Sequence, residues 1–372
     1  MDGILDRIRK HRNSSERQGT DMNIIIKRDA TTITPDGRVA GHDAGATLVR
    51  RFLRLFPGAQ LVGPSPHHAA GFDVVPLEFI DPDDSVIINM DVLDSMDVWR
   101  TVFQESGGTQ PRIMNFVWWP VHQLEHRVDR YSFALSCALF PTFAASERTA
   151  SEVRDIVQKR TVSEISSLSK LDWVNLGFRV EHVHERQEPE VPIVLYPAIY
   201  LSPTKRPDLF KKIVEKVHAR TPLKVEMRLQ ESHLISEKAM AFSRRSWIWV
   251  GPLTAERTSY YEALSHTTAF LATAEEEAYG LSYVEALGSG VVGIFPDLPW
   301  ARALLPEGYP FLYNTEQGAE QLLYQAVTDP QSCRAQLDHL VGGSFLQWIA
   351  DHHSDDAFDR EVTTCVRTWF GE

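Results

Sequence analysis

The sequence predicts an α/β protein of two domains, each built around a mainly parallel sheet. The chain has 372 residues, which is more than one hydrophobic core usually serves. Short apolar segments alternate with amphipathic ones along most of it, as strands and helices alternate in parallel sheets. A polar stretch flanked by proline, 179–191, interrupts this alternation near the middle, and we expect the linker between the domains there.

The first domain is predicted to span 22–185. It opens with an apolar strand, Met22–Lys27, continues through a loop that contains Gly41 and Gly45, and then forms a helix over Thr47–Phe56. This order of strand, glycine loop and helix is typical of the start of an α/β domain. Further strands are predicted at Gln60–Val62, Val74–Phe79, Val86–Met90, Ile113–Trp118 and Ala138–Phe143.

The second domain is predicted to span 190–345 and to repeat the same alternation. Segment 346–372 is expected to be helical, and it is left open whether it crosses back to the first domain. Strands are predicted at Ile193–Ala198, Leu223–Arg228, Ser246–Val250, Ala269–Ala272 and Val291–Phe295, with helices at Pro207–His218, Thr258–Ser265 and Leu281–Leu287.

Composition narrows the class of protein. Apolar residues make up 43% of the chain and charged residues 24%, as in ordinary globular proteins. The net charge of -12 argues against general nucleic-acid binding, which needs an excess of lysine and arginine. Cys137, Cys333 and Cys365 form no CxxC pair, so we expect free thiols and no zinc site.

The N-terminal residues 1–21 are polar and charged, and we expect them to form a solvated tail. They contain no apolar core of a secretory signal, and no apolar run in the chain reaches the ~18 residues of a membrane span. We therefore expect a cytoplasmic protein. A local contact with a membrane surface stays open, as does the oligomeric state.

The segment 267–296 contains most of the candidate ligand-binding residues. An apolar strand leads into an acidic loop, and a helix is predicted to start at Leu281, directly after Gly280. A glycine permits a tight turn and a close approach to a ligand, and a helix N-terminus suits a phosphate. Glu277 precedes this helix and Glu285 lies about 6 Å along it, so the two carboxylates are expected to contact different parts of one ligand.

This run, EAYGLSYVEA from Glu277 to Ala286, resembles the E-x7-E signature of the family 4 retaining glycosyltransferases, usually written EGFGxxxxEA. Gly290 and the valines after it resemble the end of that segment, although the family's proline is absent. The resemblance spans about 22–330 and is strongest over 267–296. It implies the GT-B fold, in which two Rossmann-like domains face each other across a cleft.

The resemblance also implies roles for individual residues. Glu277 would orient the transferred sugar and Glu285 the ribose of the nucleotide, while Gly41 and Gly45 would lie near the acceptor and the diphosphate. A histidine after a central strand of the first domain would lie near the sugar, and His122 is the candidate for it. The loop residues implied in donor binding are Ala278, Tyr279, Gly280 and Leu281.

One position departs from the family pattern. The family places an arginine, and five residues later a lysine, on the donor diphosphate; this sequence has Tyr200 and Lys205 there. A tyrosine can donate one hydrogen bond but cannot replace a bidentate guanidinium. Arg206 and Arg228 are candidates to compensate, and weakened donor binding is the alternative.

The resemblance implies a retaining, metal-independent transfer of a sugar from a nucleotide diphosphate, with a UDP- or GDP-sugar expected, to a hydroxyl-bearing acceptor. The acceptor class, whether glycan, lipid-linked or small molecule, stays open. We expect no metal site and no cofactor. Two alternatives remain: a non-catalytic subunit or chaperone of the same fold, which Tyr200 motivates, and a sugar-nucleotide epimerase.

Overall fold

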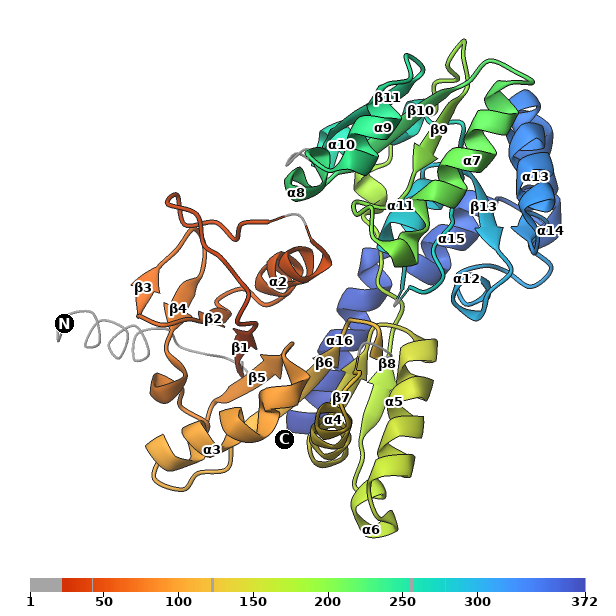
Figure 1. The fold of residues 1–372 in the computed structure, drawn as a ribbon. Coiled ribbons are helices and arrows are strands. Elements are labelled where there is room, and N and C mark those ends of the chain that lie inside the picture. The colour runs from red at the N-terminus through yellow and green to blue at the C-terminus, as the bar shows by residue number, and fades with distance from the viewer. Residues whose placement is uncertain (1–21, 42, 122–123, 254–256, 278, 372) are drawn as a thin grey trace.

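The computed structural model describes residues 22–41, 43–121, 124–253, 257–277 and 279–371. Figure 1 shows two lobes, each with a sheet and covering helices, and a C-terminal helix that reaches from the second lobe to the first. Among the described residues, no helix is both long enough and apolar enough to cross a membrane. The candidates His122 and Ala278, and the tail 1–21, lie outside these residues.

The first lobe contains a sheet of eight described strands in the order β3-β4-β2-β1-β5-β6-β7-β8. All neighbouring strands run parallel except β3 and β4. The central strand is buried over nearly its whole length, as expected where helices cover both faces of a parallel sheet. The strands are β1 (Asn23–Lys27), β2 (Gln60–Val62), β3 (His67–His68), β4 (Asp73–Val75), β5 (Ser85–Asn89), β6 (Arg112–Val117), β7 (Thr142–Ala144) and β8 (Leu171–Trp173).

Helices join these strands and cover the sheet. The first of them begins earlier than predicted, because the side chain of Asp43 caps it by accepting a hydrogen bond from the Ala46 amide. The helices are α2 (Ala44–Leu55), η1 (Leu77–Phe79), η2 (Val92–Asp94), α3 (Ser95–Glu105), α4 (Arg127–Leu139), α5 (Glu147–Arg160) and α6 (Ser163–Ser166).

The second lobe contains a parallel sheet of six described strands in the order β11-β10-β9-β12-β13-β14. Its strands are β9 (Ile193–Tyr196), β10 (Lys224–Leu229), β11 (Ile248–Pro252), β12 (Ala269–Leu271), β13 (Val292–Pro296) and β14 (Leu312–Tyr313). Its helices are η4 (Val180–His182), η5 (Pro203–Lys205), α7 (Pro207–His218), α8 (Glu231–Leu234), α9 (Glu237–Ser243), α10 (Arg257–His266), α11 (Leu281–Gly288), α12 (Pro299–Arg302), α13 (Glu316–Thr328), α14 (Pro330–Val341) and α15 (Phe345–His353). The last helix, α16 (Asp355–Phe370), returns to the first lobe.

Three predicted strands were wrong at their ends. The segment Ala138–Phe143 contains the last turn of α4 before β7 begins, so its apolar residues serve two elements. The segment Val74–Phe79 leaves the sheet at Pro76, whose ring cannot donate to the ladder, and continues as a 3-10 turn. Strand β11 begins at Ile248 rather than Ser246 and extends to Pro252. Continuous apolar runs do not mark where a helix yields to a strand.

Helix α16 packs against the first lobe, where Phe358 is fully buried among aromatic rings. Its ring centroid lies 5.9 Å from that of Phe52 and 6.1 Å from that of Phe116. The guanidinium of Arg51 in α2 lies 3.9 Å from the Phe358 ring and 2.6 Å from the carboxylate of Asp355. Aromatic packing and a buried ion pair thus fasten the end of the chain to its beginning.

The crossing point of the two lobes is a short backbone pairing. The amide of Phe178 donates to the carbonyl of His353, and the amide of Asp355 donates back to the carbonyl of Phe178. Gly177 is required beside this pairing, since a Cβ there would lie 2.1 Å from the backbone of Ser354. Two chain segments therefore pass between the lobes side by side.

Replacing Phe358 with alanine should destabilise the protein by about 3–5 kcal/mol, since the change opens a cavity in a packed aromatic cluster. Chemical denaturation of the wild type and of Phe358→Ala measures the difference. Phe79→Ala is the matched control, because Phe79 is 56% exposed. Equal stabilities of the two variants would contradict the anchoring role of α16.

Candidate active site

Each sheet reverses its direction of winding at one pair of neighbouring strands. In the first sheet the chain proceeds from β1 outward to β2 and β4, then returns to the other side of β1 with β5. In the second sheet it proceeds from β9 to β10 and β11, and returns with β12. The loops that leave the carboxyl ends of such a pair diverge and open a crevice, which is where ligands bind in open α/β sheets. Both crevices contain charged residues.

The crevice of the second sheet brings Lys205 and Glu277 together. Lys205 ends η5 in the loop after β9, Glu277 lies in the loop after β12, and their charged groups are 2.5 Å apart. Two hydrogen bonds clamp these loops: the Thr273 hydroxyl donates to the Lys205 carbonyl, and the Glu275 amide donates to the Thr204 carbonyl. The two residues expected to contact the donor thus form one ion pair on interlocked loops.

Tyr283 is a second partner of the Glu277 carboxylate. Its hydroxyl donates a 2.9 Å hydrogen bond to the same carboxylate oxygen that Lys205 contacts. Burial raises the pKa of the Tyr283 hydroxyl well above its usual value, and the charge of Glu277 raises it further. The phenol therefore remains a neutral donor. The carboxylate is held by one cationic and one neutral partner, which defines its orientation.

Helix α11 begins beside this ion pair. Gly280 precedes it with a φ of 89°, in the left-handed region that glycine tolerates, and a Cβ there would lie 2.6 Å from the Tyr283 ring. The hydroxyl of Ser282 donates to the carbonyl of Pro197 and so ties the helix start to the end of β9. The first turn contains no acidic residue, so the positive end of the helix and Lys205 act in the same direction on an anion.

A residue that the sequence analysis did not select reaches this loop from the first lobe. Arg148, at the start of α5, donates to the carboxylate of Glu276 and to the carbonyl of Glu277. Because α5 follows β7 and the acidic loop follows β12, the carboxyl ends of the two sheets face each other. No local pattern in the sequence points to it, because Arg148 lies 128 positions from Glu276.

Tyr200 does not join the Lys205–Glu277 pair. Its ring packs edge-on against His233, with the centroids 5.4 Å apart. Burial raises the pKa of its hydroxyl, Asp43 of the first lobe adds to the rise and Arg28 opposes it. Tyr200 therefore lies within electrostatic range of the first lobe and supplies no positive charge at the pair.

The glycine loop of the first lobe is organised around Arg28. The guanidinium of Arg28 binds Asp43 at 2.9 Å and covers Gly45, where a Cβ would lie 2.5 Å from it. Gly41 has a φ of 90°, and its carbonyl accepts a 2.8 Å hydrogen bond from Arg50. The backbone conformation of Gly41 favours glycine, and the guanidinium of Arg28 fills the space beside Gly45.

The remaining candidates lie apart from the ion pair. Arg206 has a left-handed backbone and lies 3.7 Å from Glu275, at the margin of the acidic loop. Arg228 binds Glu226 at 2.5 Å and lies over Trp249.

Glu285 and Tyr279 of the signature are both buried. Glu285 is 3% exposed on α11. The side chain of Tyr279 packs against α15, where its hydroxyl lies 2.6 Å from the His353 ring. Leu281 opens α11 at the helix start and is partly buried. Of the candidates, the structure joins Lys205, Glu277, Gly280 and Leu281 in one place.

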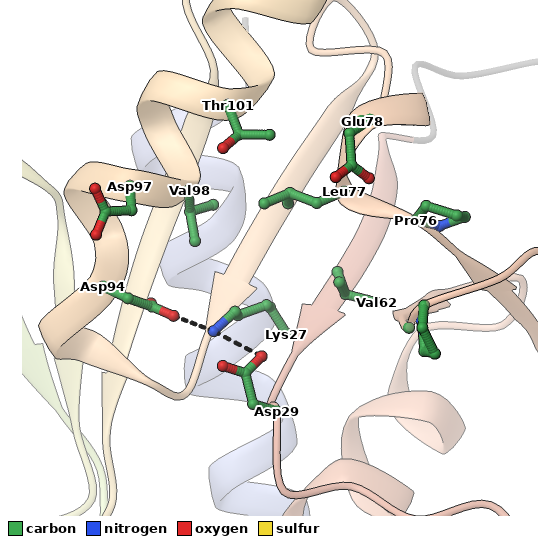
Figure 2. Close-up of a pocket in the computed structure, with 12 residues that line it drawn as sticks. Lys27, Asp29, Val62, Pro76, Leu77, Glu78, Asp94, Asp97, Val98 and Thr101 are labelled. Carbon is green, nitrogen blue, oxygen red and sulfur yellow. Dashed lines mark hydrogen bonds and ion pairs between the residues drawn. The ribbon is translucent and has the colours of Figure 1, made fainter.

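The crevice of the first sheet contains a cavity of about 340 Å³. Figure 2 shows Lys27, from the end of β1, between Asp29 and Asp94 at one end of it. Leu77 and Glu78 of η1 line one wall. The residues of α3 that line the other wall are Asp97, Val98 and Thr101.

The cavity is acidic although it is built around a lysine. Lys27 is 4% exposed and contacts the carboxylates of Asp29, Asp91 and Asp94. Burial opposes the charge of its ammonium group, but the hydrogen bonds with Asp94 and Asp29 outweigh it and raise its pKa. These three aspartates are, among the described residues, the group close enough to share a cation, and the ammonium of Lys27 contacts all of them.

Comparisons with solved structures identify the fold. A sucrose-phosphate synthase from Thermosynechococcus elongatus superposes with a TM-score of 0.67 at 10% identity, over 94% of this chain and 99% of that one. Anabaena HepE, in complex with UDP and glucose, superposes with a TM-score of 0.65 at 11% identity, over 93% of this chain and 100% of that one. A UDP-forming trehalose-phosphate synthase from Burkholderia xenovorans superposes with a TM-score of 0.65 at 10% identity, over 94% of this chain and 99% of that one.

No protein-family model matches the chain, and no curated protein matches it either. At these identities the structural likeness establishes the arrangement of the chain. The protein has the GT-B fold, as the sequence predicted: two parallel-sheet lobes with facing carboxyl ends.

The contact between the signature loop and α15 should make stability depend on pH. Burial lowers the pKa of His353 to about 4, from an ordinary value of 6.5. Its Nε2 donates to the Leu304 carbonyl and its Nδ1 accepts from Tyr279, so the folded ring is neutral. Between pH 6.5 and 4 the histidine is protonated in the unfolded chain and neutral in the folded chain. The free energy of unfolding should therefore fall by about 3 kcal/mol as the pH falls through this interval.

Urea denaturation at pH 7 and pH 5 measures the part of this loss that falls between those pH values, about 2 kcal/mol. His353→Gln is the matched variant, because an amide can keep both hydrogen bonds without titrating. The variant should lose less stability than the wild type between the two pH values. An identical loss in both proteins would show that His353 does not carry the effect.

Proposed function

We propose that this protein is a retaining, metal-independent glycosyltransferase that takes its sugar from a nucleotide diphosphate sugar. The observation that carries the proposal is the ion pair of Lys205 and Glu277 beside the start of α11, at the switch point of the second sheet. Lysine and a helix N-terminus together suit a diphosphate. A carboxylate held beside them suits the hydroxyls of the attached sugar. The solved structure of HepE, which has the same fold, contains UDP and glucose.

In this proposal the second lobe stabilises the leaving group. As the bond between the sugar and the diphosphate breaks, negative charge grows on the phosphate oxygen. Lys205 and the amides at the start of α11 would stabilise that charge, since they are fixed in place before the reaction. Lys205 would exchange part of its contact with Glu277 for the phosphate, and Glu277 would keep Tyr283 as its donor while it binds the sugar.

Metal independence is part of the proposal and has positive support. Among the described residues, the carboxylate group close enough to share a cation, Asp29, Asp91 and Asp94, contacts the ammonium of Lys27. The charge of the leaving diphosphate would be met by Lys205 and by the positive end of α11, both of which lie at the other switch point.

The cavity around Lys27 is proposed as the acceptor site, since it lies at the switch point of the first sheet. Its lining offers four carboxylates against one ammonium, and carboxylates accept hydrogen bonds from hydroxyl groups. The same excess of negative charge would repel a phosphate. We therefore propose an acceptor that is neutral or cationic where it enters this cavity, in contrast to the glucose-6-phosphate present in one trehalose-phosphate synthase structure.

Loss of either member of the ion pair should reduce transfer without unfolding the protein. The donor is first identified by a thermal-shift screen of UDP-, GDP-, ADP- and TDP-sugars, since a ligand raises apparent stability by mass action. Lys205→Ala and Glu277→Ala should each lower kcat/KM by about 100-fold or more, the size expected when a fixed charge at the reacting centre is removed.

Lys212→Ala is the matched control, because Lys212 lies on α7 and pairs with Glu316 at the surface. It should leave turnover unchanged, and EDTA should do the same to the wild type. The anomeric configuration of the product tests retention. Wild-type turnover in both Lys205→Ala and Glu277→Ala would exclude this site, and an epimerised nucleotide sugar formed without acceptor would favour the epimerase.

The charge of the acceptor cavity is tested with glucose, glucosamine and glucose 6-phosphate, titrated in the presence of the donor nucleotide. The wild type should bind glucose 6-phosphate most weakly, and Glu78→Lys should narrow or reverse that order by about tenfold. Glu105→Lys is the matched control, since Glu105 ends α3 outside the cavity. Tightest binding of the phosphate by the wild type would contradict the assignment.

A further inference from the structure

Three consecutive glutamates in the acidic loop after β12 each contact a different cation. Glu275 lies 3.7 Å from Arg206, Glu277 lies 2.5 Å from Lys205, and Glu276 contacts Arg148. Arg206 and Lys205 belong to the same lobe as the loop, whereas Arg148 belongs to the first lobe. One of the three charge pairs therefore exists only while the two lobes face each other.

Arg148 lies at a capped helix start. Ser146 caps α5 with its hydroxyl, which accepts a hydrogen bond from the Thr149 amide, so the helix start has one defined geometry. Glu152, one turn further on, binds the same guanidinium at 3.0 Å. The Arg148 side chain is 17% exposed, so it extends from a fixed helix end through a mostly closed space.

The Arg148 guanidinium donates hydrogen bonds both to a side chain and to the backbone of the loop. One nitrogen binds the Glu276 carboxylate and the other donates to the carbonyl of Glu277. That second contact fixes the peptide of the residue whose carboxylate meets Lys205 and Tyr283. A guanidinium presents its donors in a planar, rigid fork, whereas an ammonium group sits on a flexible stem and sets no such geometry.

We infer that Arg148 is a positioning residue that couples the first lobe to Glu277 and so makes placement of the donor sugar depend on closure of the lobes. The inference rests on the proposed function. The diphosphate would be held by Lys205 and α11, which lie in the second lobe. The sugar would need Glu277 in the orientation that Arg148 supports from the opposite lobe.

The test compares affinity for a nucleotide sugar with affinity for its nucleoside diphosphate, such as UDP-glucose with UDP or GDP-mannose with GDP. In Arg148→Ala the nucleotide sugar should bind about tenfold or more weakly, as expected for the loss of hydrogen bonds to a charged group. The diphosphate should bind within about twofold of wild type. A role confined to folding would weaken both ligands alike. Lys205→Ala should weaken both, because it removes a phosphate contact.

Three variants sharpen the result. Arg148→Lys should recover part of the lost affinity, since it keeps one contact of the two. Glu276→Gln should lose less affinity than Arg148→Ala, because it weakens one of the two contacts of Arg148 and leaves the Glu277 carbonyl in place. Arg154→Ala, an exposed arginine on the same helix, should match the wild type in both affinities.

The possible failures are distinguishable. If the wild type binds no nucleoside diphosphate and no nucleotide sugar, the proposed function fails and this inference fails with it. If the wild type binds both and Arg148→Ala keeps the wild-type ratio of the two affinities, the inference alone is overturned. Thermal unfolding of each variant confirms that the ratio is measured on folded protein.

Discussion

The reversal of winding in each sheet is the constraint on which the rest of this structure depends. At the pair β1 and β5, and at the pair β9 and β12, neighbouring strands send their loops in opposite directions, and the gap between the loops becomes the crevice. The first crevice holds Lys27 among aspartates, and the second holds Lys205 against Glu277. In both, a lysine at or beyond the end of a central strand meets a carboxylate that follows the neighbouring strand.

The two crevices matter together only because the lobes are held face to face. Helix α16 provides the permanent part of that attachment, with Phe358 buried in the aromatic core and Arg51 paired to Asp355. Arg148 provides a contact at the opposite edge, directly on the acidic loop. The first attachment combines aromatic packing with ion pairs, whereas the second is made by one charged side chain.

The signature loop is connected to both attachments. Tyr279 extends from it to His353, which lies next to the backbone pairing where the chain passes between the lobes. Glu276 extends from it to Arg148 on the other side. The loop expected to contact the donor sugar is thus braced by the crossing segment and by the opposite lobe. A change in the relative position of the lobes would alter the contact between this loop and Arg148.

The sequence by itself determined the alternation of strands and helices, hence two parallel sheets, because burial on both faces requires continuous apolar strands. It also located Glu277, Gly280 and the start of α11, since a glycine turn into a helix is encoded within a few residues. Tertiary structure alone decided that Lys205 pairs with Glu277 across 72 positions, that Tyr279 turns away to His353, and that Arg148 arrives from the other lobe. Local patterns carry turns and faces, but charge pairs between distant segments depend on how two separate sheets are packed, which no short stretch of sequence encodes.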